Sequence, residues 1–167
     1  MPERVGYLGL GSNVGDSVGH LRGALDLLAA EGVAILAVSS LYVTEPVGEI
    51  LDQPDFLNAA VRIATELDPE QLLDACKAVE AERGRHFDLP RHSPRPLDVD
   101  LLLLGDLVLR TERLELPHPQ VRDRRFVLAP LLELDPDLTL PDGTVLADAL
   151  AALPEGEQRV ELRGPFV

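Results

Sequence analysis

The 167-residue sequence contains no tryptophan, a single cysteine and only 4% aromatic residues. One cysteine excludes an intrachain disulfide and fits a reducing environment, so we expect a cytoplasmic protein. We interpret this residue, Cys76, as part of the packing of a helix. The shortage of aromatic rings disfavours an RNA-recognition domain, because such domains stack bases on exposed strand aromatics.

Long apolar runs and an excess of positive charge are missing as well. No run approaches the ~20 apolar residues that span a bilayer, and no charged-then-apolar leader opens the chain, so we expect no membrane association. The sequence has 15 Lys and Arg against 29 Asp and Glu, a net charge of −14. This charge argues against a general binder of nucleic acid or of acidic membranes, because both are polyanions.

Internal repeats and linkers are also absent, and 46% of the residues are apolar. The chain is therefore predicted to form one domain over residues 1–167, and we expect a monomer. Hydrophobic periodicity predicts strands and helices in alternation. The predicted strands are 5–12, 33–44, 56–65 and a fourth within 95–106, and the predicted helices are 16–32 and 68–83.

This β-α-β-β-α-β order is the split βαβ, ferredoxin-like α+β fold, with an antiparallel sheet and both helices on one face. The other face would be open for a site. The second helix has a strong start in Asp68-Pro69-Glu70-Gln71, which combines an N-cap, a proline at the first position and a capping box. GLGSNVGD (9–16) lacks GxGxxG spacing, so we interpret it as a tight strand-to-helix turn. A C-terminal extension is expected to hold a hairpin through Gly105-Asp106 and short helices near 119–124, 126–132 and 144–152.

Asp98 and Asp100 stand at the start of the most apolar segment, LDVDLLLL (97–104). In an extended strand their side chains share a face about 6.6 Å apart, so the carboxylates repel by roughly 2 to 3 kcal/mol at an effective dielectric near 20. A divalent cation held by both carboxylates and completed by water and phosphate oxygens would relieve this repulsion, as is usual for Mg²⁺. The structural alternative is that one aspartate caps a turn and the other pairs with an arginine.

Arginine is concentrated around this pair. Residues 83–125 contain nine arginines and seven acidic residues, a surplus of two positive charges, so the rest of the chain carries −16. A guanidinium matches two phosphate oxygens at once, which favours a local pocket for an anionic ligand over a set of unrelated surface arginines.

Three other classes of protein fit parts of the pattern. One is a different two-metal enzyme on a ferredoxin-like sheet, such as a nucleotidyl cyclase or a polymerase palm. The second is an RNA-recognition module. The third is an acidic interaction protein without catalysis, in which the aspartates pair structurally with arginines.

The segment RHSPRPLDVDLL (91–102) resembles the signature of the 6-hydroxymethyl-7,8-dihydropterin pyrophosphokinases, a family of folate-biosynthesis enzymes. Further stretches follow the family's order and spacing over nearly the whole chain. They are GSNVGD (11–16), SSLYVTEPVG (39–48), DQPDFLNAAV (52–61), ERGR (82–85), LPHP (116–119) and PDG (141–143). The resemblance implies transfer of pyrophosphate from ATP to the hydroxymethyl oxygen of 6-hydroxymethyl-7,8-dihydropterin, with release of AMP. It also implies Mg²⁺ as the cofactor, as two ions brought with ATP.

The resemblance assigns roles to individual residues. Asp98 and Asp100 match the family's two magnesium-binding aspartates, and with Arg85 and Arg95 they form the predicted catalytic set. The residues expected to bind ATP are Lys77, Glu80, Arg85, His92, Arg95, Arg113, His118 and Arg124. The residues expected to bind the pterin are Thr44, Pro46, Val47, Phe56, Asn58 and Phe126. His92 stands where well-known members carry a tryptophan.

The residues assigned to the pterin also suit it chemically. Asn58 offers donors and an acceptor, as the mixed edge of a pterin requires, and Phe56 and Phe126 could sandwich a flat heterocycle. Taken singly, each has a structural alternative: an amide that ties a strand end to a loop, or rings packed in the core. A lone histidine between two prolines, such as His118, also has a structural alternative.

Overall fold

The computed structural model describes residues 2–46, 53–84 and 96–167. Its elements follow the predicted order and continue past it. In chain order they are β1 (Arg4–Ser12), α1 (Ser17–Ala30), β2 (Val33–Val38), β3 (Leu41–Thr44), β4 (Phe56–Thr65), α2 (Pro69–Glu82), β5 (Asp98–Leu104), β6 (Leu109–Arg110), β7 (Glu115–Leu116), α3 (Arg125–Leu134), α4 (Leu146–Ala152) and β8 (Val160–Gly164).

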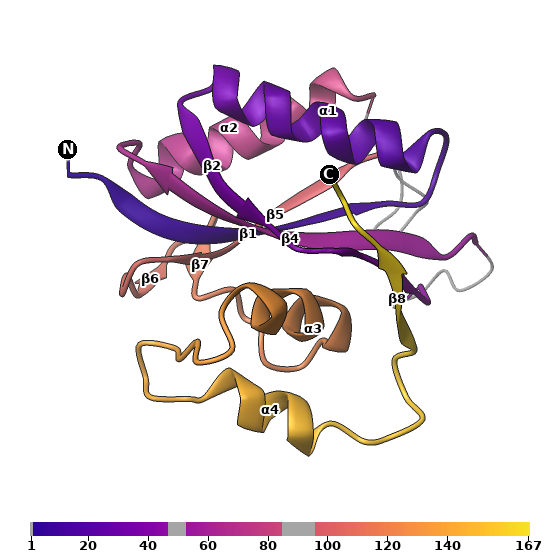
Figure 1. The fold of residues 1–167 in the computed structure, drawn as a ribbon. Coiled ribbons are helices and arrows are strands. Elements are labelled where there is room, and N and C mark those ends of the chain that lie inside the picture. The colour runs from indigo at the N-terminus through magenta and orange to yellow at the C-terminus, as the bar shows by residue number, and fades with distance from the viewer. Residues whose placement is uncertain (1, 47–52, 85–95) are drawn as a thin grey trace.

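The main sheet has the order β5-β1-β4-β3-β8, and β2 also pairs with β4. The pairings described for it are antiparallel. Helices α1 and α2 lie together on one face (Figure 1), so the predicted ferredoxin-like α+β arrangement is confirmed. In the part of the chain that the structure describes, no helix has the length and apolar character needed to cross a bilayer.

Both predicted helix starts are confirmed by their caps. Asp16 accepts a hydrogen bond from the backbone N–H of Gly19 (3.1 Å) at the start of α1. At α2 the Asp68 carboxylate accepts from the N–H of Gln71 (2.8 Å), and the Gln71 side chain accepts from the N–H of Asp68 (3.0 Å). Each cap satisfies backbone donors that the first turn of a helix leaves without partners.

The single strand predicted over 33–44 is wrong, because it is interrupted at Ser39 and Ser40. The Ser39 hydroxyl accepts from the N–H of Ala60 (2.9 Å) and donates to the carbonyl of Ser40 (2.8 Å), which inserts a side chain into the ladder. The N–H of Ser40 donates to Glu133 of α3 (2.8 Å). The chain therefore bends into β2 and β3, and both still pair with β4.

The second sheet face is only partly open, contrary to the sequence-based expectation, because α3 and α4 lie below it (Figure 1). They form a second apolar core with side chains of the sheet, including Ala60, Leu102 and Leu103. Leu101 and Leu104 instead belong to the core under α1 and α2. Since β5 is covered on both faces, its apolar run is continuous rather than alternating.

Two details of the C-terminal extension also differ from the prediction. The chain does turn at Gly105, which has a positive φ of 54°, but the next strand, β6, pairs with β7 rather than with β5. Residues 119–123 form turns instead of the helix predicted near 119–124. The N–H of Val121 donates to the carbonyl of His118, and the N–H of Asp123 donates to that of Gln120, a spacing of three residues where an α-helix has four.

Candidate active site

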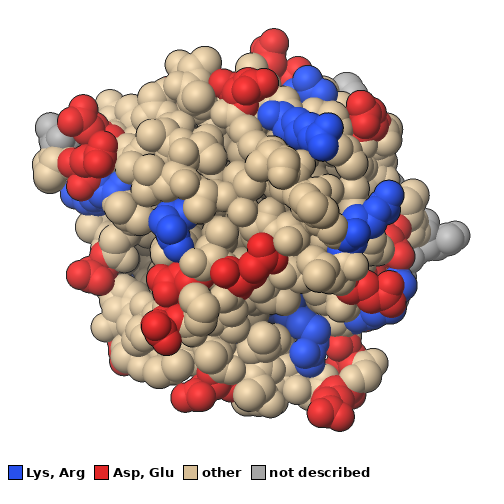
Figure 2. Space-filling model, viewed as in Figure 1, with Lys and Arg blue, Asp and Glu red and all other residues tan. Residues whose placement is uncertain are grey.

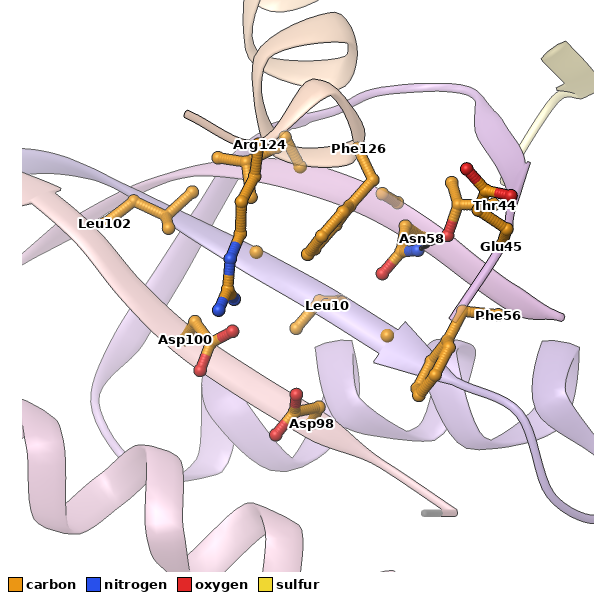
Figure 3. A pocket seen from close by; sticks show the side chains of 15 residues that line it. Leu10, Thr44, Glu45, Phe56, Asn58, Asp98, Asp100, Leu102, Arg124 and Phe126 are labelled. Carbon is orange, nitrogen blue, oxygen red and sulfur yellow. Dashed lines mark hydrogen bonds between the residues drawn. The ribbon is translucent and has the colours of Figure 1, made fainter. Parts of the chain in front are cut away.

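Three neighbouring strands form the floor of the site on the sheet face that carries α3 (Figure 3). Asp98 and Asp100 of β5 lie opposite Gly11 and Gly9 of β1. Gly11 in turn lies opposite Asn58 of β4. Because cross-strand partners project to the same face, this register brings two carboxylates, a strip of bare backbone and an amide onto one surface.

The glycines leave the centre of this floor without side chains. A Cβ atom on Gly11 would lie 2.6 Å from Asn58 Oδ1, which is too close, whereas a Cβ on Gly9 would make an ordinary 3.5 Å contact with a methyl group of Leu102. Glycine inside a strand often marks a place where another group approaches the backbone. The interpretation of residues 9–16 as a turn missed this role, although the period-two spacing of the glycines within a predicted strand was a usable signal.

A pocket opens above the floor and is bounded by β3, β4 and the start of α3; we call it the ring pocket. Its free space, including the part open to solvent, is about 620 Å³. Phe56 of β4 and Phe126 of α3 both line it. At its base the Asn58 side chain donates to Thr44 Oγ1 (2.5 Å). Two aromatic rings above a fixed carboxamide fit a flat heterocycle with a polar edge.

Arg124 immediately precedes α3 and reaches into the ring pocket. Its guanidinium carbon lies 5.5 Å from the centroid of the Phe126 ring, a cation–π distance. Figure 3 shows the guanidinium pointing toward Asp100. The sequence assigned Arg124 to the nucleotide; the structure places it between the ring pocket and the aspartates, where it can meet an anionic group.

A second pocket borders the same two aspartates from the side of α2 and β7; we call it the charged pocket. Its apolar lining includes Leu73, Leu101 and Leu114. Its polar lining is Lys77, Glu80, Asp98, Asp100, Arg113, Glu115 and His118. Sequence reasoning found most of the polar set but missed Glu115 and the leucines, because apolar residues on a helix and a strand are normally read as core.

Glu80 has a structural contact that the sequence did not predict. It is 4% exposed, and its carboxylate accepts a hydrogen bond from the backbone N–H of Val99 (2.7 Å). Val99 lies between Asp98 and Asp100, so Glu80 holds the strand segment that aims both carboxylates. Glu80 also lines the charged pocket.

Arg113 lines the charged pocket but is engaged by α2. One of its terminal nitrogens is 2.6 Å from a Glu70 oxygen, and the other is 2.6 Å from an Asp74 oxygen. The two acids are four residues apart and lie on the same side of the helix. Both terminal nitrogens of Arg113 could therefore meet one phosphate in place of these carboxylates after the arginine exchanges partners.

His118 is placed to donate a hydrogen bond. Its Nδ1 accepts from the N–H of Gln120 (3.1 Å), so the proton of the neutral ring lies on Nε2. Burial and then the positive charge of Arg124 lower the pKa of His118, while Asp98 and Glu115 act in the opposite direction. A neutral imidazole with an Nε2 proton can donate to a phosphate oxygen.

Comparison with known proteins places this geometry in a family. The chain matches the model of the 7,8-dihydro-6-hydroxymethylpterin-pyrophosphokinase family over residues 7–136. The chain belongs to this family. The resemblance found in the sequence is thereby confirmed.

Curated pyrophosphokinases are similar over nearly their whole length. The chain is 45% identical over 162 residues to the 2-amino-4-hydroxy-6-hydroxymethyldihydropteridine pyrophosphokinase of Pseudomonas aeruginosa, covering 96% of this chain and 98% of the relative. It is 48% identical over 157 residues to the protein of the same name from Methylorubrum extorquens, with 93% and 98% covered. The same family is therefore reached from two separate relatives.

Solved structures support the fold. The HPPK-DHPS protein of Plasmodium falciparum, solved with pterin and p-hydroxybenzoate, matches with a TM-score of 0.67 at 16% identity. The match covers 90% of this chain but 42% of that one, so this chain spans less than half of the longer protein. At this identity the likeness shows the fold alone.

Several residues that the pyrophosphokinase signature implicates lie outside the described residues. They are Val47, Arg85, His92 and Arg95, and their roles stay predictions. Pro46 is half-buried directly after Glu45, and it is Glu45 that lines the ring pocket.

The described residues supply few protein ligands for a metal ion. Within the ranges 2–46, 53–84 and 96–167, no group of three or more His, Cys, Asp or Glu side chains forms a metal-binding cluster. Asp98 and Asp100 are both carboxylates, the kind of ligand that Mg²⁺ prefers.

Proposed function

We propose that this protein transfers pyrophosphate from ATP to the hydroxymethyl group of 6-hydroxymethyl-7,8-dihydropterin, a step of folate biosynthesis that yields AMP and the pterin diphosphate. The observation that carries the proposal is that Asp98 and Asp100 line both the ring pocket and the charged pocket. A heterocycle in one pocket and a nucleotide in the other would meet at these carboxylates. Holding two substrates in contact makes their reaction effectively unimolecular.

In the ring pocket, the pterin would lie against Phe56 and Phe126. The Asn58 amide, held by its hydrogen bond to Thr44, would face the ring edge that carries alternating donors and acceptors. The bare backbone at Gly11 leaves room for the ring to approach the sheet. This orientation directs the hydroxymethyl group toward the aspartates.

In the charged pocket, the leucines would contact the base of ATP and the polar side chains its phosphates. Lys77 and His118 line the charged pocket and Arg124 lines the ring pocket, in each case together with the two carboxylates. Such cationic and donor groups stabilise charge that develops on transferring phosphoryl oxygens. Arg113 would contribute after leaving Glu70 and Asp74.

Asp98 and Asp100 are the residues that would hold Mg²⁺. The donor set fits this ion, because two carboxylates from one strand leave most coordination positions for phosphate oxygens and water. When bound, Mg²⁺ would neutralise charge that develops on the phosphate oxygens.

The reaction changes two bonds at the β-phosphorus. A bond forms from the hydroxymethyl oxygen to this phosphorus, and the bond from the phosphorus to the oxygen that joins it to the α-phosphate breaks. AMP leaves with that electron pair, and the hydroxyl proton is released. We assign no covalent nucleophile and no general base, and we expect positioning and electrostatic stabilisation to supply the rate.

Phosphorus NMR of the protein with ATP, Mg²⁺ and 6-hydroxymethyl-7,8-dihydropterin tests the proposal. AMP together with a diphosphorylated pterin is the expected result. Formation of ADP, release of free pyrophosphate as by a cyclase or polymerase, or absence of turnover would refute it.

Isosteric variants test the role of the carboxylates. Asp98→Asn and Asp100→Asn are each expected to lower AMP formation by about 100-fold or more, with an unchanged circular dichroism spectrum and loss of Mg²⁺-dependent ATP binding. Asp106→Asn, at an exposed position just after β5, is the matched control and should behave as the wild type. Normal Mg²⁺-dependent binding in both site variants would contradict the assignment.

A further inference from the structure

Two consecutive residues of the C-terminal segment contact opposite walls of the ring pocket. Gln158 and Arg159 come directly before β8, the strand that pairs with β3 at the sheet edge (yellow in Figure 1). They lie beyond residues 7–136, which match the family model. Neither residue carries a motif that sequence reasoning could single out.

Gln158 holds the wall formed by α3. Its Oε1 accepts from the backbone N–H of Arg125 (2.8 Å), and its Nε2 donates to the carbonyl of Asp123 (3.0 Å). Arg124 lies between these two contacts and is the N-cap of α3, without a capping hydrogen bond from its own side chain. Gln158 therefore replaces the missing cap and fixes the backbone that presents Arg124 and Phe126.

Arg159 holds the opposite wall, formed by β3 and β4. Its N–H donates to the Glu45 carboxylate (2.8 Å), and its carbonyl accepts from the N–H of Glu45 (3.3 Å). Its guanidinium lies 2.7 Å from Asp55. Glu45 directly follows Thr44, and Asp55 directly precedes Phe56. Thr44 and Phe56 are cross-strand partners in β3 and β4.

The backbone between the two arms is strained. Gln158 has a positive φ of 52°, a conformation that is unfavourable for a residue other than glycine. This conformation sends neighbouring side chains to different elements, one to α3 and the other to the β3–β4 end. Contacts on both sides hold the strained backbone in place.

We propose that Gln158 and Arg159 form a brace that sets the separation of the two walls of the ring pocket and so position the heterocyclic substrate. The inference rests on the proposed function, whose ring substrate lies between these walls. The side chains of the Arg159–Asp55 pair are 47% and 39% exposed, and ion pairs this exposed add little to stability. Removal of this pair is therefore expected to leave Tm close to the wild-type value.

Steady-state kinetics of single variants test the brace. Arg159→Met removes the ion pair with Asp55 and leaves the backbone contacts to Glu45 in place. Gln158→Gly removes both side-chain contacts to the start of α3 while tolerating the positive φ. In each, we expect KM for the pterin to rise about tenfold and by more than KM for ATP. Tm should stay close to the wild-type value in Arg159→Met and fall by a few degrees in Gln158→Gly, because the latter loses a helix cap. Arg159→Lys keeps the charge but lacks the planar fork, so it should restore part of the pterin KM. Arg163→Met changes an exposed arginine on β8 itself and is expected to match the wild type.

The outcomes separate the brace from the proposed function. The brace is overturned if KM for the pterin is unchanged in both variants, or if KM rises equally for both substrates. Wild-type turnover in the same assay would still support the proposed function. A wild-type protein that makes no AMP overturns both. Should Arg159→Met unfold, Asp55→Ala removes the same ion pair from the other side and carries the same expectations.

Discussion

Alanine at Gly11 is expected to impair binding of the pterin while sparing binding of the nucleotide. The added Cβ would lie 2.6 Å from Asn58 Oδ1, so the amide has to rotate. Rotation breaks its hydrogen bond to Thr44, which is only 2% exposed, and turns the amide away from the ring. The backbone at this position needs no positive φ, so the steric contact is the main perturbation.

The contacts give the size of both effects. Leaving the buried Thr44 hydroxyl without its donor costs about 1–3 kcal/mol, which lowers Tm by roughly 2–12 °C in a chain of this length. Loss of two neutral hydrogen bonds from Asn58 to the ring corresponds to about 1–3 kcal/mol, or a rise in Kd of roughly 5- to 150-fold.

Calorimetry can measure the two ligands separately. The pterin is titrated into protein saturated with Mg²⁺ and a non-hydrolysable ATP analogue, and the analogue is titrated alone. Gly9→Ala serves as the structural control, because its Cβ makes a 3.5 Å contact on the same strand and should leave Tm near the wild-type value. A Gly11→Ala protein that keeps the wild-type Kd for the pterin, or that loses affinity for both ligands equally, would refute the reasoning.

Three further predictions follow from buried groups. Glu80→Ala leaves the N–H of Val99 without its acceptor, so unfolding in urea should show a loss of about 1–3 kcal/mol; an unchanged midpoint would contradict this. Because the pKa of His118 is lowered in the folded state, its contribution to stability is complete above about pH 6.5 and is lost as pH falls through the folded pKa. The difference in Tm between wild type and His118→Gln should therefore shrink on acidification, and a constant difference would count against it. Burial, together with the charges of Glu80 and Asp100, raises the pKa of Cys76 to about 12, so a thiol reagent at mildly alkaline pH should react only after denaturation; rapid reaction of the native protein would disprove this.

Local signals in the sequence were enough to predict the core of the fold. Strand periodicity and the capping residues at Asp16 and Asp68 act within a few residues of where they stand, so they can be read without tertiary structure. The break at Ser39 and Ser40 could not be predicted in this way. It depends on Ala60 in β4 and on Glu133 in α3, which are distant in sequence.

The candidate site also has features that the sequence predicted and features that depend on tertiary packing. The shared face of Asp98 and Asp100 follows from the period of a strand, and the family resemblance supplied Asn58 and the two phenylalanines. The backbone contact of Glu80 and the α2 partners of Arg113 depend on how helix, strand and hairpin pack. No sequence pattern predicts such contacts, because neither residue of a contacting pair stands out in the sequence.

Contacts with other elements also explain how two like charges can stand at the start of an apolar strand. β5 pairs with β1 along one edge, and Glu80 holds the backbone of Val99. Leu101 and Leu104 anchor the strand in one core, while Leu102 and Leu103 anchor it in the other. The direction of both carboxylates is therefore fixed by the scaffold before any ligand arrives. A repulsion of roughly 2 to 3 kcal/mol is small beside the burial of four leucine side chains, at about 1.5–3 kcal/mol each. The fold can accordingly keep the pair preorganised, and the proposed magnesium nucleotide would then mainly neutralise its charge.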